Sequence, residues 1–220
     1  KQDVYPIIFK FFGEDFHFNP YGRLTAQELK PSGIIPPLYT QHIEDYIRGT
    51  YQGVALELTE CTLSNGDSRY HRQVFRGIFV RIALHKPFSG RTVLLRRKRL
   101  GRMFKSKEIT ELQRVTLEAS EFNSRFDIFS SDQIEARYLL TTSFMERLIR
   151  FEEVMESKGL QASFYENYLL LMIPTKLDRF EGISFTKQVT FYQDINVIMR
   201  EMSDIFAIIE HLKLHEDTRL

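Results

Sequence analysis

The stretch VFRGIFVRIAL, residues 74–84, decides how this chain folds. Its side chains separate into two sets that alternate along the chain. One set is apolar except at Arg76: Val74, Ile78, Val80, Ile82 and Leu84. The opposite set contains Phe75, Phe79 and Arg81. Because successive side chains of a strand point to opposite faces, this period of two predicts a β-strand.

The same period extends outward in both directions, over residues 46–129. Val54, Leu56 and Leu58 alternate with more polar neighbours, and residues 65–67 (NGD) predict a hairpin turn before the next strand. Residues 87–90 turn the chain again before a strand at 92–95, and two further strands are expected near 114–118 and 125–129. Short connections between strands predict antiparallel neighbours. Residues 160–174 read as another hairpin, turning near Glu166 and Asn167.

Helical spacing occurs at both ends of the chain and between the strands. Residues 1–13 predict a short N-terminal helix. Residues 132–157 are expected to be helical, with Asp132 and Glu135, and then Ser143 and Glu146, spaced as helix-capping pairs. Over residues 190–214, apolar side chains recur at steps of three and four, which is typical of a long amphipathic helix.

These patterns predict an α+β fold: a mainly antiparallel sheet packed by helices, with a long C-terminal amphipathic helix. We expect one domain over residues 1–220, the soluble part of a longer protein, because the chain begins at Lys1. The C-terminal helix either covers the sheet or pairs with a second copy to form a homo-oligomer.

Composition excludes several classes of protein. Cys61 is the single cysteine, so an internal disulfide or a cysteine-only metal site is impossible. Neither a phosphate-binding loop nor a dinucleotide-binding glycine motif is present, and no apolar run is long enough to span a membrane. The sequence therefore predicts no cofactor, no metal and no catalytic residue.

Three stretches resemble a bacterial family of uncharacterised proteins, domain of unknown function 3137. They are residues 45–53 (DYIRGTYQG), residues 75–79 (FRGIF) with 87–92 (PFSGRT), and residues 125–148, which begin RFD and end FMERL. The resemblance implies a cytoplasmic domain whose relatives often carry membrane-spanning segments before it. It implies no catalytic residues, because none are established for the family.

A basic run is the most suggestive feature for binding. Between Arg91 and Lys107 there are eight basic residues and no acidic one. We take six of them as the candidate anionic-surface site: Arg96, Arg97, Lys98, Arg99, Arg102 and Lys105. Such crowding predicts either a solvated loop or a contact with an anionic membrane surface or an acidic protein. Only Phe104 could stack on a base in this loop, which disfavours nucleic acid.

The two halves of the chain differ in net charge. Residues 1–110 contain 18 basic and 10 acidic side chains, and residues 111–220 contain 12 and 19. The halves, at +8 and −7, either attract one another or leave the basic half for an anionic partner.

A second charged group offers an alternative polar site. Asp127, Asp132, Glu135 and Arg137 could perform acid–base chemistry, or they could cap a helix and form ion pairs. The sequence thus favours a cytoplasmic binding or regulatory module, tethered to the inner membrane by segments absent from this chain, over an enzyme with a site at these four residues.

Overall fold

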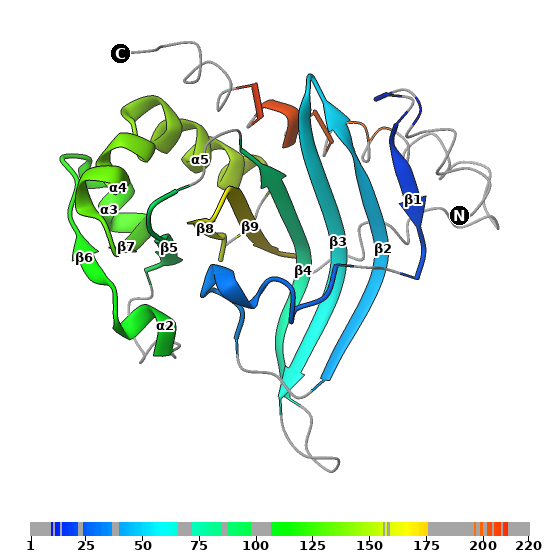
Figure 1. Ribbon diagram of the computed structural model, residues 1–220, viewed down its shortest axis with the longest axis horizontal. Helices are drawn as coiled ribbons and strands as arrows, with labels where there is room; N and C mark the ends of the chain where they lie inside the picture. Colours follow the sequence, from blue (N-terminus) through cyan, green and yellow to red (C-terminus); the bar gives the residue numbers. More distant parts are fainter. Residues whose placement is uncertain are drawn as a thin grey trace.

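A computed structural model describes most of the chain before residue 176. The described residues are 10, 12–13, 15–21, 24–36, 40–65, 72–84, 88–97, 107–155, 157, 159–175, 196, 199, 202–203, 205–207 and 209–210. One antiparallel sheet of nine strands dominates them (Figure 1). The strands are β1 (His17–Asn19), β2 (Thr40–Tyr51), β3 (Val54–Asn65), β4 (Arg72–Ala83), β5 (Thr92–Arg96), β6 (Gln113–Val115), β7 (Phe126–Ser130), β8 (Gln161–Tyr165) and β9 (Tyr168–Pro174).

The strand order is β1-β2-β3-β4-β9-β8-β5-β7-β6. The β8–β9 hairpin therefore lies between β4 and β5, which follow one another in the sequence. Residues 169–173 of β9 are apolar without interruption and buried on both faces of the sheet. This pattern is expected for a central strand.

The helices are short. They are the 3₁₀ turn η1 (Lys30–Ser32) and the helices α2 (Lys107–Thr110), α3 (Ser120–Arg125), α4 (Gln133–Leu139) and α5 (Thr142–Val154). Asp132 caps α4 by accepting hydrogen bonds from Ile134 N and Glu135 N, as its sequence position predicts. The prediction for the next helix is wrong, because Thr141 caps α5 in place of Ser143.

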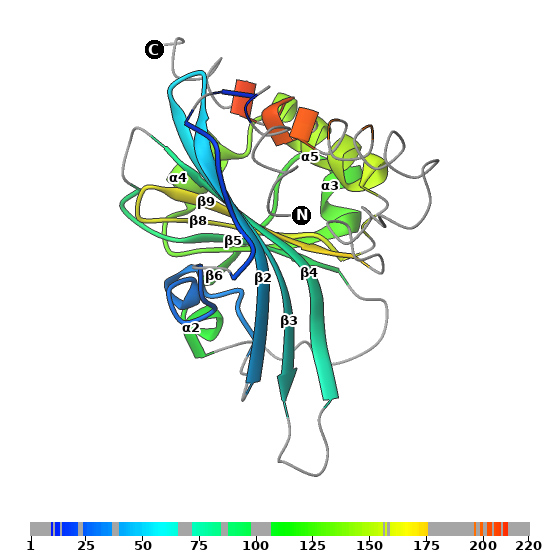
Figure 2. The same ribbon diagram turned by 90° about the vertical axis from the view of Figure 1, so that its right-hand side faces the viewer.

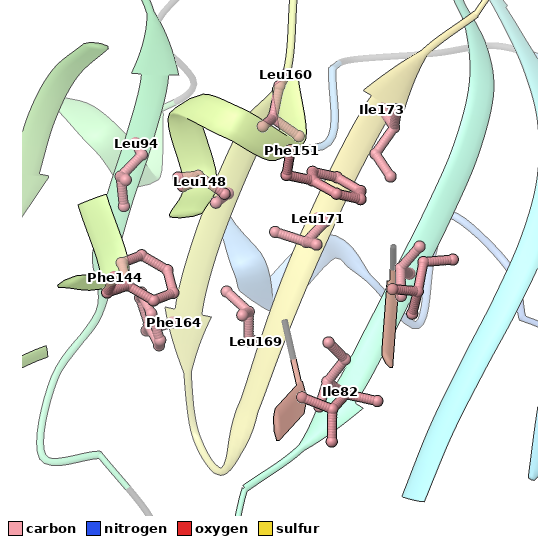
Figure 3. Close-up of a cluster of buried hydrophobic side chains, with 14 of the residues drawn as sticks. Ile82, Leu94, Phe144, Leu148, Phe151, Leu160, Phe164, Leu169, Leu171 and Ile173 are labelled. Atoms are coloured by element: carbon pink, nitrogen blue, oxygen red, sulfur yellow. The ribbon is translucent and has the colours of Figure 1, made fainter. Parts of the chain in front are cut away.

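Two apolar cores lie on opposite faces of the sheet. Figure 2 shows α3 and α5 on one side of the sheet, and η1 and α2 on the other. On the first side, Leu148 and Phe151 of α5 lie beside Phe164, Leu169 and Leu171 of β8 and β9 (Figure 3). The second core lies under residues 24–35 and α2 and contains Phe79, Leu170 and Met172. Alternation along β4 and β9 thus supplies side chains to both cores.

The three long strands β2, β3 and β4 extend beyond the rest of the sheet. Their lower ends project in both ribbon views (Figures 1 and 2). The register explains this extension, since β9 pairs with β4 only from Gly77 to Ala83 and leaves the first residues of β4 beyond its end.

The fold class predicted from the sequence, an α+β domain with a long C-terminal amphipathic helix, is wrong. The nine-stranded sheet dominates, the longest described helix has 13 residues, and the described C-terminal residues form no long helix. Met202, Ile205, Phe206 and Ile209 are nevertheless buried in the first core. The spacing of these apolar residues reflects the burial of one side of the segment. Burial of one side does not determine how long a helix is. The expected N-terminal helix lies mostly outside the described residues.

Candidate functional site

A row of polar and charged residues crosses strands β1 to β4 at one end of the sheet. His17 of β1 is opposite Arg48 of β2, Arg48 is opposite Glu57 of β3, and Glu57 is opposite Arg81 of β4. Residues directly opposite one another share a face, and their side chains are close enough to interact. Arg81 is in turn opposite Leu170, so the row lies on the face of the second core.

Glu57 is the centre of this row. Its Oε1 accepts a hydrogen bond of 2.5 Å from the Tyr46 hydroxyl, and its Oε2 accepts one of 2.7 Å from Arg81 Nε. The Arg81 guanidinium also lies over the Tyr168 ring, with Cζ 4.9 Å from its centroid. Both oxygens of Glu57 are therefore occupied by groups of the protein itself.

Burial and this network shift two pKa values. Burial, together with the hydrogen bond to Glu57, raises the pKa of Tyr46 well above that of an exposed tyrosine. Burial disfavours the charged form of Arg81, but the hydrogen bond and charge of Glu57 outweigh it and raise the pKa of Arg81. Tyr46 thus remains a neutral donor and Arg81 a cation.

A pocket of about 380 Å³ opens over the row. Its lining combines polar and apolar side chains and comes from strands β1 to β4, the turn before β1 and the start of β9: Asp15, His17, Tyr46, Arg48, Gly49, Thr50, Ala55, Leu56, Glu57, Arg81, Ala83 and Tyr168. Asp15, His17 and Arg48 are exposed, and none of their side chains forms a hydrogen bond or ion pair with another described residue. The pocket therefore has unused donors and one unused carboxylate.

The structure gives contacts for two of the six residues of the candidate anionic-surface site. Arg96 Nη1 donates to Glu152 Oε2 at 2.9 Å and its guanidinium lies over Phe126. Arg97 Nη1 donates to the Asn123 carbonyl oxygen at 2.8 Å, and its Nε is 3.8 Å from Asp127 Oδ1. These bonds hold the end of β5. Lys98, Arg99, Arg102 and Lys105 lie outside the described residues.

The alternative polar site separates into structural contacts. Asp127 accepts from Arg114 at 2.8 Å, and Asp132 caps α4. Glu135 accepts hydrogen bonds from the backbone nitrogens of residues 89 and 90, at 2.9 and 3.1 Å, and so fixes the turn before β5. Arg137 donates to Gln133 on its own helix. None of the four lines the pocket, and these bonds support the capping and ion-pairing interpretation.

The described residues also bear on metal ligation and thiol chemistry. No group of three or more histidine, cysteine or acidic side chains there could hold a metal ion. Cys61 is buried, and burial, with the charge of Glu60, raises the pKa of its thiol.

The pocket residues were missed by the sequence analysis. Arg81 did stand out as a charged residue among the apolar residues 77–84, which is the signal that could have found it, whereas Glu57 belongs to the more polar set of its strand. Their pairing depends on the register between β3 and β4, and the alternation within one strand does not specify that register.

Comparison with known proteins identifies a family and one structural neighbour. A family model described as "Protein of unknown function (DUF3137)" matches residues 73–214, more than half of the chain. No curated protein matches the sequence. The crystal structure of the mycobacterial trehalose monomycolate transport factor A, TtfA, is similar at a TM-score of 0.46 and 10% identity, over 90% of this chain and 92% of that one. Among the described helices, none has the length and apolarity needed to cross a membrane.

Proposed function

Because this chain belongs to the family described as "Protein of unknown function (DUF3137)", we propose a function from its charge distribution: it is a binding module on the cytoplasmic side of a bacterial inner membrane. Its partner is the anionic membrane surface. The contact is made by the basic segment, defined as residues 98–107.

Charge balance around the basic segment carries the proposal. Arg96 and Arg97, just before it, already have acidic partners in Glu152 and Asp127. The segment itself, KRLGRMFKSK, contains five basic residues and no acidic one. Its charge is therefore not neutralised within its own sequence, and like charges at this density repel one another unless an anion or water separates them.

The sequence of the basic segment also fits a lipid surface. Leu100, Met103 and Phe104 are interspersed among its cations. Basic side chains gain about 1 kcal/mol each near an anionic leaflet, and apolar side chains add affinity by entering the interface. Four such contacts exceed the roughly 0 to 1 kcal/mol of an ordinary exposed ion pair.

Vesicle co-sedimentation tests this proposal. We expect the purified chain to bind vesicles of anionic lipid, but not vesicles of neutral lipid, at low salt. Because electrostatic reach shortens to about 8 Å at physiological ionic strength, binding should weaken as salt is added. The variant with glutamine at Lys98, Arg99, Arg102 and Lys105 should lose binding and keep its stability.

A matched control removes the same charge elsewhere. Lys30, Arg72, Arg147 and Arg150 are exposed cations, and their replacement by glutamine should leave vesicle binding nearly unchanged. Failure of the unmodified chain to bind anionic vesicles, or equal losses in both variants, would contradict the proposal. Binding to polyglutamate without binding to vesicles would assign the segment to an acidic protein instead.

A further inference from the structure

We propose that the pocket over strands β1 to β4 is a binding site for a small organic oxyanion, a carboxylate or a phosphate ester, held by Arg48 and His17. This inference goes beyond the membrane contact proposed above, because it concerns different residues and a soluble ligand.

Arg48 is the residue that points to an anion. Glu57 is its direct neighbour across the β2–β3 pair and would be its natural ion-pair partner. Tyr46 and Arg81 occupy both oxygens of Glu57 instead. The Arg48 side chain is left exposed at the pocket wall, and its guanidinium has no hydrogen bond or ion pair to another described residue. A free guanidinium presents a planar fork of donors that matches carboxylate and phosphate oxygens.

Packing of Phe16 on the opposite face of the sheet places a second hydrogen-bond donor, His17, beside Arg48. Phe16 is buried in the first core, where its ring lies against Gly49: a Cβ at Gly49 would be only 2.5 Å from that ring. His17 begins β1 on the other face of the sheet, and Asp15 and His17 both line the pocket. His17 is directly opposite Arg48, so the two donors are adjacent.

The charges of the pocket favour an organic anion with a second polar group. Arg81 and Glu57 neutralise one another through their ion pair. Arg48 and Asp15 remain, one cation and one carboxylate. Asp15 can accept a hydrogen bond from a hydroxyl or amino group of a ligand whose anionic end is bound by Arg48. The volume of about 380 Å³ is suited to such a molecule, since small-molecule sites span roughly 300–1,000 Å³.

Titration with two soluble probes, followed by amide chemical shifts, tests this inference. Malate supplies carboxylates with a hydroxyl, glycerol 3-phosphate supplies a phosphate ester with hydroxyls, and glycerol is the neutral control. Ionic strength is held constant with sodium chloride. We expect at least one anion to shift the amides of residues 15–17 and 46–50 saturably, and glycerol to leave them unchanged. The anion that causes the shifts identifies the class of ligand: malate indicates a carboxylate, and glycerol 3-phosphate indicates a phosphate ester.

Substitutions identify the donor. Arg48→Gln should weaken binding by about tenfold or more, as expected for loss of a charged hydrogen bond, and Arg48→Lys should have an intermediate effect. Arg72→Gln removes an exposed cation of β4 outside the pocket lining and should leave the affinity unchanged.

Two results would overturn the assignment: no saturable shift with either anion, or equal affinity in the unmodified chain and Arg48→Gln. Because Arg48 is exposed, Arg48→Gln should unfold at nearly the same temperature as the unmodified chain. This variant should also keep its vesicle binding, so the pocket and the membrane contact can fail independently.

Discussion

The carboxylate of Glu152 on α5 accepts a hydrogen bond of 2.9 Å from Arg96 Nη1 on β5, 56 residues earlier in the chain. Arg125 Nη1 is 3.5 Å from the same oxygen. Glu152 is only 5% exposed, and its other oxygen, Oε1, is buried without a hydrogen-bond partner in the described part of the chain. Burial therefore raises the pKa of Glu152, although both arginines oppose this effect.

This raised pKa predicts a pH dependence of stability. The folded state binds the Glu152 proton more tightly than the unfolded state does. The stabilisation from Glu152 is therefore fully present below the unfolded-state pKa and is lost as the pH rises through the higher folded-state pKa. Each pKa unit of difference corresponds to about 1.4 kcal/mol of unfolding free energy.

Chemical denaturation of the unmodified chain and of Glu152→Gln, between acid and neutral pH, measures this contribution. Glutamine cannot titrate, so the stability of the unmodified chain should fall relative to the variant as the pH rises. A difference between the two proteins that stays constant with pH, or that changes in the opposite direction, would show that the folded-state pKa is not raised.

Gly77 predicts a second effect on stability. It pairs with Pro174 of β9, and a Cβ on Gly77 would lie 2.9 Å from both Pro174 Cα and Thr175 N. Gly77→Ala should cost about 2 to 3 kcal/mol of unfolding free energy, because two strand backbones would have to separate.

Gly53→Ala is the matched control for Gly77→Ala. Gly53 has φ +84° but no atom within 4 Å of its Cβ position, so only backbone strain of about 1 kcal/mol is expected. Equal losses in the two variants would refute the role of close strand packing.

Local patterns predicted much of the strand content. A few neighbouring residues were enough to predict four features: the alternation in β3 and β4, the β8–β9 hairpin, the β6–β7 pair and the capping of α4 by Asp132. Each of these features is determined by side chains close together in the sequence. The charge asymmetry left two alternatives open, attraction between the halves or an anionic partner, and the Arg96–Glu152 and Arg97–Asp127 pairs are two contacts between the halves.

The pairing of strands that are distant in the sequence could not be predicted in the same way. Insertion of β9 beside β4 depends on contacts between residues nearly a hundred positions apart, such as Phe79 with Met172. The pocket depends on the same information, because Arg48, Glu57 and Arg81 become neighbours only when three strands adopt one register. The basic run was visible in the sequence, but not the engagement of Arg96 and Arg97 in ion pairs.

Cys61 should react slowly with thiol reagents in the folded protein. Its side chain is buried in the second core, and burial raises its pKa, so little thiolate is exposed to the reagent. We expect labelling at least about 100-fold slower in native buffer than in denaturant, because local opening must come first. Ser143→Cys in a Cys61→Ala background places a thiol at an exposed position of α5 and should react rapidly. Comparable native rates for the two thiols would contradict the burial of Cys61.

Phe206 should be as important to stability as a residue of the sheet, although it lies in the C-terminal part of the chain. Its ring stacks on Tyr51 of β2, with centroids 3.9 Å apart and planes 9° from parallel. It also packs edge-on against Phe12 and Phe16, at 5.3 and 6.0 Å, and only 6% of its surface is exposed. Phe206→Ala should therefore cost about 3 kcal/mol of unfolding free energy, because it removes apolar contacts and leaves a cavity.

Met199 provides the control for Phe206, since it belongs to the same segment and is 37% exposed. Met199→Ala should change the unfolding free energy by less than about 1 kcal/mol. Denaturant titrations of both variants, monitored by circular dichroism, measure the two losses on one scale. A large loss for Phe206→Ala alone would show that the C-terminal residues unfold together with the sheet. Equal, small losses would mean that this segment contributes little to the cooperative core and that the Tyr51–Phe206 stack is weak.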